Sequence, residues 1–149
     1  MRCIPREIIR PPTSLKLLYR YLMGYTPPME MPLSEVVDRY SILLLKKERL
    51  PENEELKKEC SRFEAELSRY KERGNIEELI AQLKEVNGQI WDLESDIRKG
   101  KEGELGLEEV GRRALAIREL NAERIRRKNR IAAERGEFVE VKVDHGSVL

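Results

Sequence analysis

The feature that most constrains this chain is a heptad repeat of apolar residues between positions 76 and 97. These residues alternate at spacings of three and four: Ile76, Leu79, Leu83, Val86, Ile90, Leu93 and Ile97. That spacing is typical of a helix that packs an apolar seam against other helices. A preceding stretch repeats it with Leu56, Cys60, Phe63, Leu67 and Tyr70. The repeat therefore predicts an all-α fold.

Residues that stop or cap helices divide the sequence into long segments. The expected helices cover residues 35–50, 52–73, 76–99 and 107–135. They end at Pro51, Gly74, Gly100 and Gly136, and Ser34 and Asn75 are the expected N-caps of the first and third. The first helix is apolar nearly all round, which predicts that it is central and most buried. Three to four long helices with short connections predict an antiparallel bundle or long helical hairpins.

The segments on either side of this bundle have a different character. Residues 1–33 hold six of the seven prolines, and we expect one short helix there, over 15–23. The bundle is expected over 34–136, followed by a tail over 137–149. Within the tail, residues 138–144 alternate with period two, and Val139, Val141 and Val143 share one face, which predicts a short β-strand. Such a strand needs a partner, either residues 2–4 or the same strand of a second copy.

Composition excludes several classes of protein. The chain has 29 Lys and Arg against 28 Asp and Glu, a net charge of +1, so charge alone gives no argument for nucleic-acid binding. No apolar run approaches the roughly 18 residues of a membrane span, and no leader is recognisable, so we expect a cytosolic protein with no membrane contact. Two glutamines in a chain that is 38% charged suggest a thermophilic source.

The sequence also argues against several kinds of catalytic site. Two cysteines are too few for a disulfide framework, and Cys60 lies on the predicted seam, where a buried structural thiol is expected. His145 is the only histidine and lies in the tail, which argues against histidine acid–base catalysis inside the bundle. The sequence contains no glycine-rich phosphate loop, nucleophile elbow or zinc-ligand spacing.

Polar residues occupy helix positions where a bundle should be apolar. Burying an unpaired charge costs several kcal/mol, so these groups are expected to pair across helices or to line a wet cleft. The candidate cluster consists of Glu35, Asp38, Lys46, Asn87, Trp91, Glu94, Asn121, Arg124 and Lys128. Two interpretations are open: a ligand-binding site, or an ion-pair network that fixes the register of the bundle.

The candidate cluster falls in three segments, residues 33–46, 87–98 and 121–131. Residues 33–46 are similar to the motif G-E-L-(I)-D-K-(I/L)-(T/S)-I-L-x-x-K, residues 87–98 to N-x-x-L-W-x-x-E-D-x-x-R, and residues 121–131 to N-D-x-R-x-x-x-K-x-x-I. In these motifs the chain resembles a family of small uncharacterised helical proteins from bacteria and phages. The sequence departs from the motifs at Ser95 and Ala122, where acids are frequent in the family, and residues 1–32 have no counterpart in them. The resemblance implies a shared helical fold with a common polar face, and no activity.

The leading functional hypothesis is a cytosolic binding or assembly module, a homodimer, whose partner is a protein or an anionic small molecule and which needs no cofactor. The alternative is an all-α enzyme that acts on a phosphorylated or anionic small molecule. There Glu35, Asp38 and Glu94 would hold Mg²⁺ or act as a base, while Arg124 and Lys128 would bind the anion. A third hypothesis is nucleic-acid binding through the fourth helix, which has five basic residues between positions 124 and 130.

Overall fold

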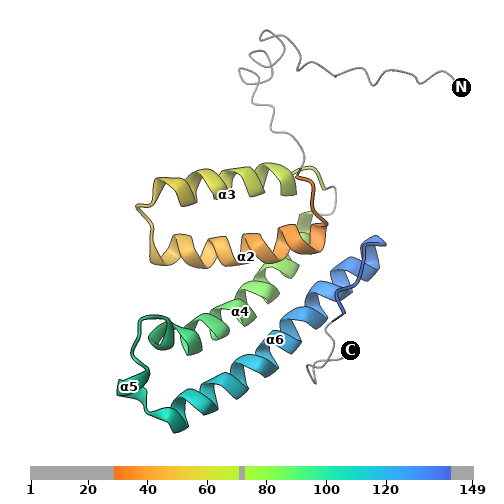
Figure 1. Ribbon diagram of the computed structural model, residues 1–149. Coiled ribbons are helices and arrows are strands. Elements are labelled where there is room, and N and C mark those ends of the chain that lie inside the picture. The colour runs from red at the N-terminus through yellow and green to blue at the C-terminus, as the bar shows by residue number, and fades with distance from the viewer. Residues whose placement is uncertain (1–28, 71–72, 142–149) are drawn as a thin grey trace, which may run out of the picture.

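The computed structural model describes residues 29–70 and 73–141 (Figure 1). The helices are α2 (Leu33–Arg49), α3 (Glu54–Leu67), α4 (Arg73–Arg98), the single turn α5 (Glu102–Leu105) and α6 (Leu107–Arg135). These residues contain no strand, so the all-α prediction is confirmed for the described part of the chain. The short helix expected over 15–23 lies outside the described residues.

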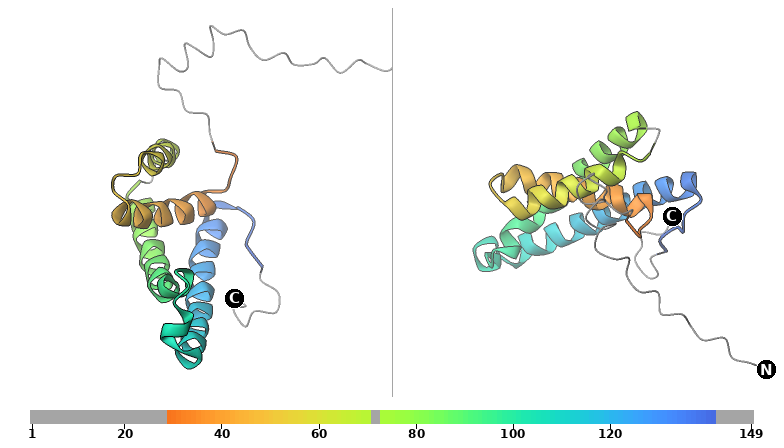
Figure 2. Two further views of the ribbon diagram at one scale, coloured as in Figure 1. Left: turned by 60° about the vertical axis from the view of Figure 1, so that its left-hand side comes forward. Right: turned by 90° about the horizontal axis from the view of Figure 1, so that it is seen from above.

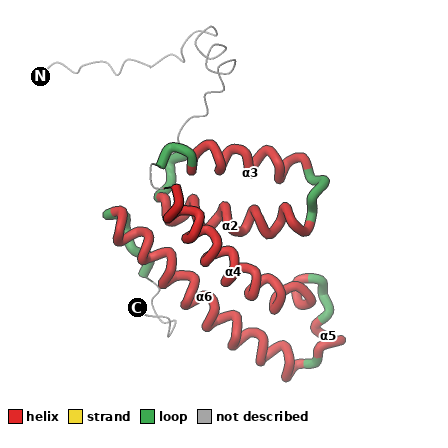
Figure 3. The backbone as a smooth tube through the Cα atoms, turned by 180° about the vertical axis from the view of Figure 1, so that it is seen from behind, coloured by secondary structure: helices red, strands yellow, loops and turns green. Residues whose placement is uncertain are grey.

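The helices form two hairpins that cross each other. In the first, α3 packs along α2; in the second, α4 and α6 run side by side and α5 closes the turn between them (Figure 3). Figure 2 shows α2 lying across both long helices of the second hairpin. As expected for a helix that is apolar nearly all round, α2 is central, because it contacts α3, α4 and α6.

The apolar core lies where the first half of α2 meets α3, the start of α4 and the end of α6. Its buried residues are Leu33, Val36, Val37, Leu43, Cys60, Phe63, Leu67, Ile76, Ile80, Leu83 and Ile131. Cys60 is 1% exposed, and burial raises the pKa of its thiol, as expected for a structural cysteine. In the heptad seam of α4, Ile76, Leu83 and Val86 are buried, whereas the seam is only half-buried from Ile90 onward.

The boundary between α3 and α4 differs from the prediction. We expected one helix up to Gly74 with Asn75 capping the next, whereas α3 ends at Leu67 and both residues lie inside the first turn of α4. Two turn bonds that span three residues follow α3, from the Arg69 and Tyr70 amides to the carbonyls of residues 66 and 67, at 3.1 and 3.2 Å. These tighter bonds end the helix before the glycine is reached.

The start of α2 is capped by a distant residue. Ser34 was expected to be the N-cap, but the helix begins at Leu33 and its cap position, Pro32, has no side-chain hydrogen bond. Instead, the Glu137 carboxylate accepts hydrogen bonds from the amides of Leu33 at 2.6 Å and Ser34 at 3.2 Å. A carboxylate suits a helix N-terminus because it satisfies unpaired amides and complements the helix dipole. This contact ties the end of α6 to the start of α2.

The predicted C-terminal strand is not present in the described residues. Residues 137–141 are non-helical and form no strand, and Val139 and Val141 are exposed rather than half-buried. The backbone of Glu140 is instead bound by the side chain of Asn129, on α6. Residues 142–144, and the alternative strand partner at 2–4, lie outside the described residues.

Candidate functional site

A buried carboxylate, Asp38, lies at the crossing of α2 with α4 and α6. Only 1% of Asp38 is exposed. Arg124 on α6 binds it with two nitrogens: Nε donates to Oδ1 at 2.9 Å, and Nη2 donates to Oδ2 at 2.6 Å. A bidentate arginine–carboxylate contact fixes geometry as well as adding attraction. It therefore sets the position of α2 relative to α6.

Helix α4 joins the same network through Asn87. Its Nδ2 donates to Asp38 Oδ1 at 3.1 Å and to Ser41 Oγ at 2.9 Å. The Ser41 hydroxyl in turn donates to the backbone carbonyl of Asp38 at 2.6 Å. Within the described residues, no buried side-chain nitrogen or oxygen lacks a hydrogen-bond partner. The network is thus fully satisfied, which is the condition for buried polar groups to stabilise a unique arrangement.

Lys128 lies one helical turn after Arg124 and is 6% exposed. Its Nζ is 2.5 Å from Glu35 Oε1, 3.2 Å from Glu140 Oε2 and 3.9 Å from Asp38 Oδ2. Three carboxylates surround this amine, which compensates the cost of burying it. Lys128 therefore joins the start of α2 to the segment that follows α6.

These contacts hold each group of the network in its charged form. Burial by itself raises the pKa of Asp38, but the hydrogen bonds and charge of Arg124, together with Asn87 and Lys128, lower it below 3.8. Burial lowers the pKa of Lys128, yet the contacts with Glu35, Asp38 and Glu140 outweigh it and raise that pKa above 10.5. Asp38 is therefore a weak base in the folded protein.

A pocket of about 610 Å³ adjoins the network between α2, α4 and α6. Its apolar lining comes from Ile42, Leu45, Leu50, Ile90 and the ring of Trp91. Its polar lining consists of Lys46, Arg49, Asn87, Glu94, Ser95, Arg98, Lys99, Asn121 and Arg124. Asn87 and Arg124 thus belong to both the network and the pocket wall.

The pocket is basic in a chain that is nearly neutral. Five cationic side chains and one carboxylate line it. Three of the cations are already paired with carboxylates: Arg49 with Asp92 at 2.7 Å, Arg98 with Glu94 at 2.7 Å, and Arg124 with Asp38. The side-chain amines of Lys46 and Lys99 form no hydrogen bond or ion pair with any described residue. These two amines are the groups available to a ligand.

The structure divides the nine candidate residues between two adjoining places. Those in the buried network are Glu35, Asp38, Asn87, Arg124 and Lys128. The other four, Lys46, Trp91, Glu94 and Asn121, line the pocket, and Asn121 Oδ1 lies 3.5 Å from Arg124 Nη1.

Several residues of the site were missed from the sequence. Ser41 lies one turn after Asp38 on the same helix face, so its spacing could have identified it. Arg98 was not among the nine candidates, although it lies one helical turn after Glu94 and lines the pocket beside it. Nothing in the sequence identifies Glu140 as a partner of Lys128, because Glu140 lies in a segment with the pattern of a strand.

The three carboxylates considered for Mg²⁺ do not act together. Glu94 pairs with Arg98 on its own helix, whereas Glu35 and Asp38 bind cations of α6. Among the described residues, no group of three or more histidine, cysteine or acidic side chains could hold a metal ion. The anion-binding role predicted for Arg124 and Lys128 also changes, since both are engaged by carboxylates.

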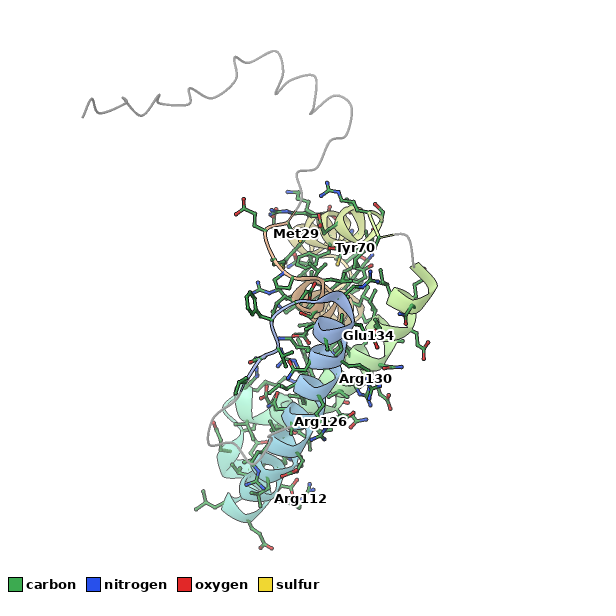
Figure 4. The ribbon with its side chains drawn as sticks, turned by 90° about the vertical axis from the view of Figure 1, so that its right-hand side faces the viewer. Met29, Tyr70, Arg112, Arg126, Arg130 and Glu134 are labelled. Atoms are coloured by element: carbon green, nitrogen blue, oxygen red, sulfur yellow. The ribbon has the colours of Figure 1, made fainter. Side chains whose placement is uncertain are left out.

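The basic residues of α6 do not form one stripe. Arg124 and Lys128 point inward to Asp38 and Glu35, while Arg126 pairs with Glu123 at 2.9 Å. Figure 4 shows Arg126 and Arg130 along the helix together with Arg112 and Glu134. Neighbouring acids thus interrupt the surface that a phosphate backbone would have to follow.

Comparisons with protein-family models, curated proteins and solved structures found no match for this chain. The resemblance of three segments to uncharacterised bacterial and phage proteins therefore stays a prediction. In the described part of the chain, no helix is both long and apolar enough to cross a membrane.

Proposed function

We propose that this protein is a binding module whose pocket between α2, α4 and α6 takes an anionic small molecule with a flat or apolar part. The proposal places the module in the cytosol, as the sequence predicts, and requires no cofactor. Of the two partners that the sequence analysis leaves open for a binding module, a protein or an anionic small molecule, it takes the second.

The observation that carries the proposal is that two of the cations in the pocket have no carboxylate partner. Lys46 and Lys99 line a cavity of about 610 Å³ and have no ion partner among the described residues. Binding pockets are typically concave and mostly apolar, with a few polar groups that orient the ligand. Here the apolar part comes from Ile90 and Trp91, and the amines supply attraction for an anion.

The same geometry favours binding over acid–base catalysis. In the enzyme alternative Asp38 was a candidate base, but Arg124 and Asn87 occupy its oxygens and keep its pKa low. A general base works best with a pKa near the operating pH and with access to the substrate proton. At 1% exposure, Asp38 lacks that access.

Calorimetry with a defined panel of anions tests the proposal. The probes are inorganic phosphate, pyrophosphate, a nucleoside monophosphate and triphosphate, and an aromatic carboxylate. At least one probe that combines a ring with an anion is expected to bind and to raise the melting temperature. Loss of one amine by Lys46→Met should weaken that binding about tenfold, the scale of a charge-assisted contact.

The matched control is Lys47→Met, which removes a neighbouring exposed lysine that is not part of the pocket lining. It should leave the affinity unchanged in a buffer of fixed ionic strength. A flat response across the whole panel would contradict the proposal. Equal weakening by Lys46→Met and Lys47→Met would contradict it too, because it would show nonspecific attraction to a basic surface.

A further inference from the structure

The pocket between α2, α4 and α6 lies at the C-terminal ends of two helices. Its lining includes Lys46, Arg49 and Leu50 from the end of α2, and Arg98 and Lys99 from the end of α4. Both helices end on the same side of the molecule, the left-hand side of Figure 1. No lining residue belongs to the first turn of a described helix. The pocket is therefore close to the negative poles of two helix dipoles, and no described helix brings a positive pole to it.

These poles reduce the positive charge that a ligand meets in the pocket. Arg49, Arg98 and Arg124 are each paired with a carboxylate. The net positive charge of the lining therefore comes from the side chains of Lys46 and Lys99. The C-terminal pole of a helix is equivalent to about half a negative charge, so two poles offset roughly one of the two lysine charges. The charge that is left matches a ligand with one negative charge.

The pocket also contains neutral hydrogen-bond donors that no described residue uses. Asn121 Oδ1 lies toward Arg124 Nη1, at 3.5 Å, and Asn121 Nδ2 has no partner in the described part of the chain. The indole N–H of Trp91 and the hydroxyl of Ser95 likewise form no hydrogen bond with a described residue. An ionised carboxylate only accepts hydrogen bonds and has about four acceptor positions. The neutral donors can therefore bind a carboxylate without adding positive charge.

We propose that the ligand of this pocket is a monocarboxylate with a ring, and that phosphate esters bind less tightly. This inference rests on the proposed function and narrows its ligand from anions in general to one chemical class. The lysine amines and the neutral donors bind the carboxylate. The ring packs against the apolar part of the lining, which includes Leu45, Ile90 and Trp91.

A phosphate ester suits the pocket less well because it carries more charge. A phosphate monoester has a charge of about −1.5 to −2 at pH 7. Phosphate sites commonly use the free amides at a helix N-terminus or a bidentate arginine. No described helix begins at this pocket, and its three arginines are engaged by carboxylates. The second negative charge of a phosphate would therefore lie near two helix C-termini without a cation to compensate it.

Calorimetry with probes that share one ring tests the ligand class. Naphthoate and naphthyl phosphate, substituted at the same ring position, differ only in the anionic group, and naphthamide is the uncharged control. At pH 8, naphthoate should bind about tenfold more tightly than naphthyl phosphate, because each helix pole changes the affinity of a charge about two- to fivefold and two poles act together. Naphthamide should bind more weakly than naphthoate.

Two variants test whether the charge of the pocket causes this preference. Asp92→Asn removes the partner of Arg49, which lines the pocket. Asp96→Asn removes the same charge one helical turn later, but its partner Arg113 is not part of the lining. Asp92→Asn should strengthen the binding of naphthyl phosphate about threefold and narrow its difference from naphthoate. Asp96→Asn should leave that difference unchanged.

The outcomes separate this inference from the proposed function. Equal binding of naphthoate and naphthyl phosphate overturns the ligand class, and if Lys46→Met weakens both, the pocket remains an anion site. The ligand class is also wrong if neither naphthyl probe binds while a nucleotide does. Absence of binding by every anion contradicts the proposed function, and the inference with it. Naphthamide that binds as tightly as naphthoate contradicts both, because charge would then contribute nothing.

Discussion

Asp38→Asn is the substitution that most directly tests the buried network. The replacement keeps the shape of the side chain and the Oδ1 acceptor used by Arg124 Nε and Asn87. It turns the Oδ2 acceptor into an amide, which would then face the donor Nη2 of Arg124. The variant therefore removes one charge and places two donors against each other without opening a cavity.

The expected loss in the free energy of unfolding depends on whether the cations left without Asp38 can be solvated or find other partners. Breaking a fully buried ion pair costs about 3–5 kcal/mol. The Arg124 side chain is 29% exposed and can turn partly to solvent, while Lys128 keeps Glu35 and Glu140 as partners. We therefore expect a loss of about 2–4 kcal/mol in the free energy of unfolding. For a chain of this size that lowers the melting temperature by roughly 6–12 °C.

Urea unfolding followed by circular dichroism at 222 nm measures this loss, with Asp92→Asn as the matched control. Asp92 makes a comparable 2.7 Å contact with Arg49, but its side chain is 70% exposed, so its loss should cost less than about 1 kcal/mol. The reasoning is refuted if the two variants are equally stable, because the buried pair would then contribute no more than a surface pair.

Two further predictions concern pH and the capping of α2. The stability difference between the wild type and Asp38→Asn should be constant well above pH 3.8 and should shrink as acid protonates Asp38. The reason is that a carboxyl group with a lowered pKa stabilises the fold only while it is charged. A stability difference that stays the same at every pH would contradict this prediction. Glu137→Ala should cost about 1 kcal/mol and speed hydrogen exchange of the Leu33 and Ser34 amides, whereas the exposed control Glu134→Ala should do neither.

The helices were predictable because their signals are local. The heptad spacing from Ile76 to Ile97 identifies α4, and Gly136, with a φ of 67°, ends α6 where a left-handed residue is needed. The junction between α3 and α4 was not predictable in the same way. Gly74 is an ordinary stop signal, but the turn bonds after Leu67 end the earlier helix first.

Contacts between distant segments explain the other differences. Ser34 has the sequence of an N-cap, yet a carboxylate more than 100 positions away caps the helix. Alternation in the tail predicts a strand, yet the Asn129 side chain binds the Glu140 backbone inside this chain. No local pattern encodes either contact, because both depend on how the end of α6 crosses the start of α2.

The two interpretations of the polar cluster concern adjoining parts of one structure: the ion pairs form the buried network, and the proposed ligand site is the pocket beside it. In α4, the buried residues from Ile76 to Val86 precede Asn87, and the pocket residues from Ile90 to Arg98 follow it. The network of Asp38, Asn87 and Arg124 therefore forms the border between core and pocket. This polar layer fixes where α2 crosses the second hairpin. The apolar core therefore need not continue past Asn87 to hold the helices in place. The pocket thus depends on the network for its shape, and in the proposed function the side chains of Lys46 and Lys99 would supply the attraction for an anion.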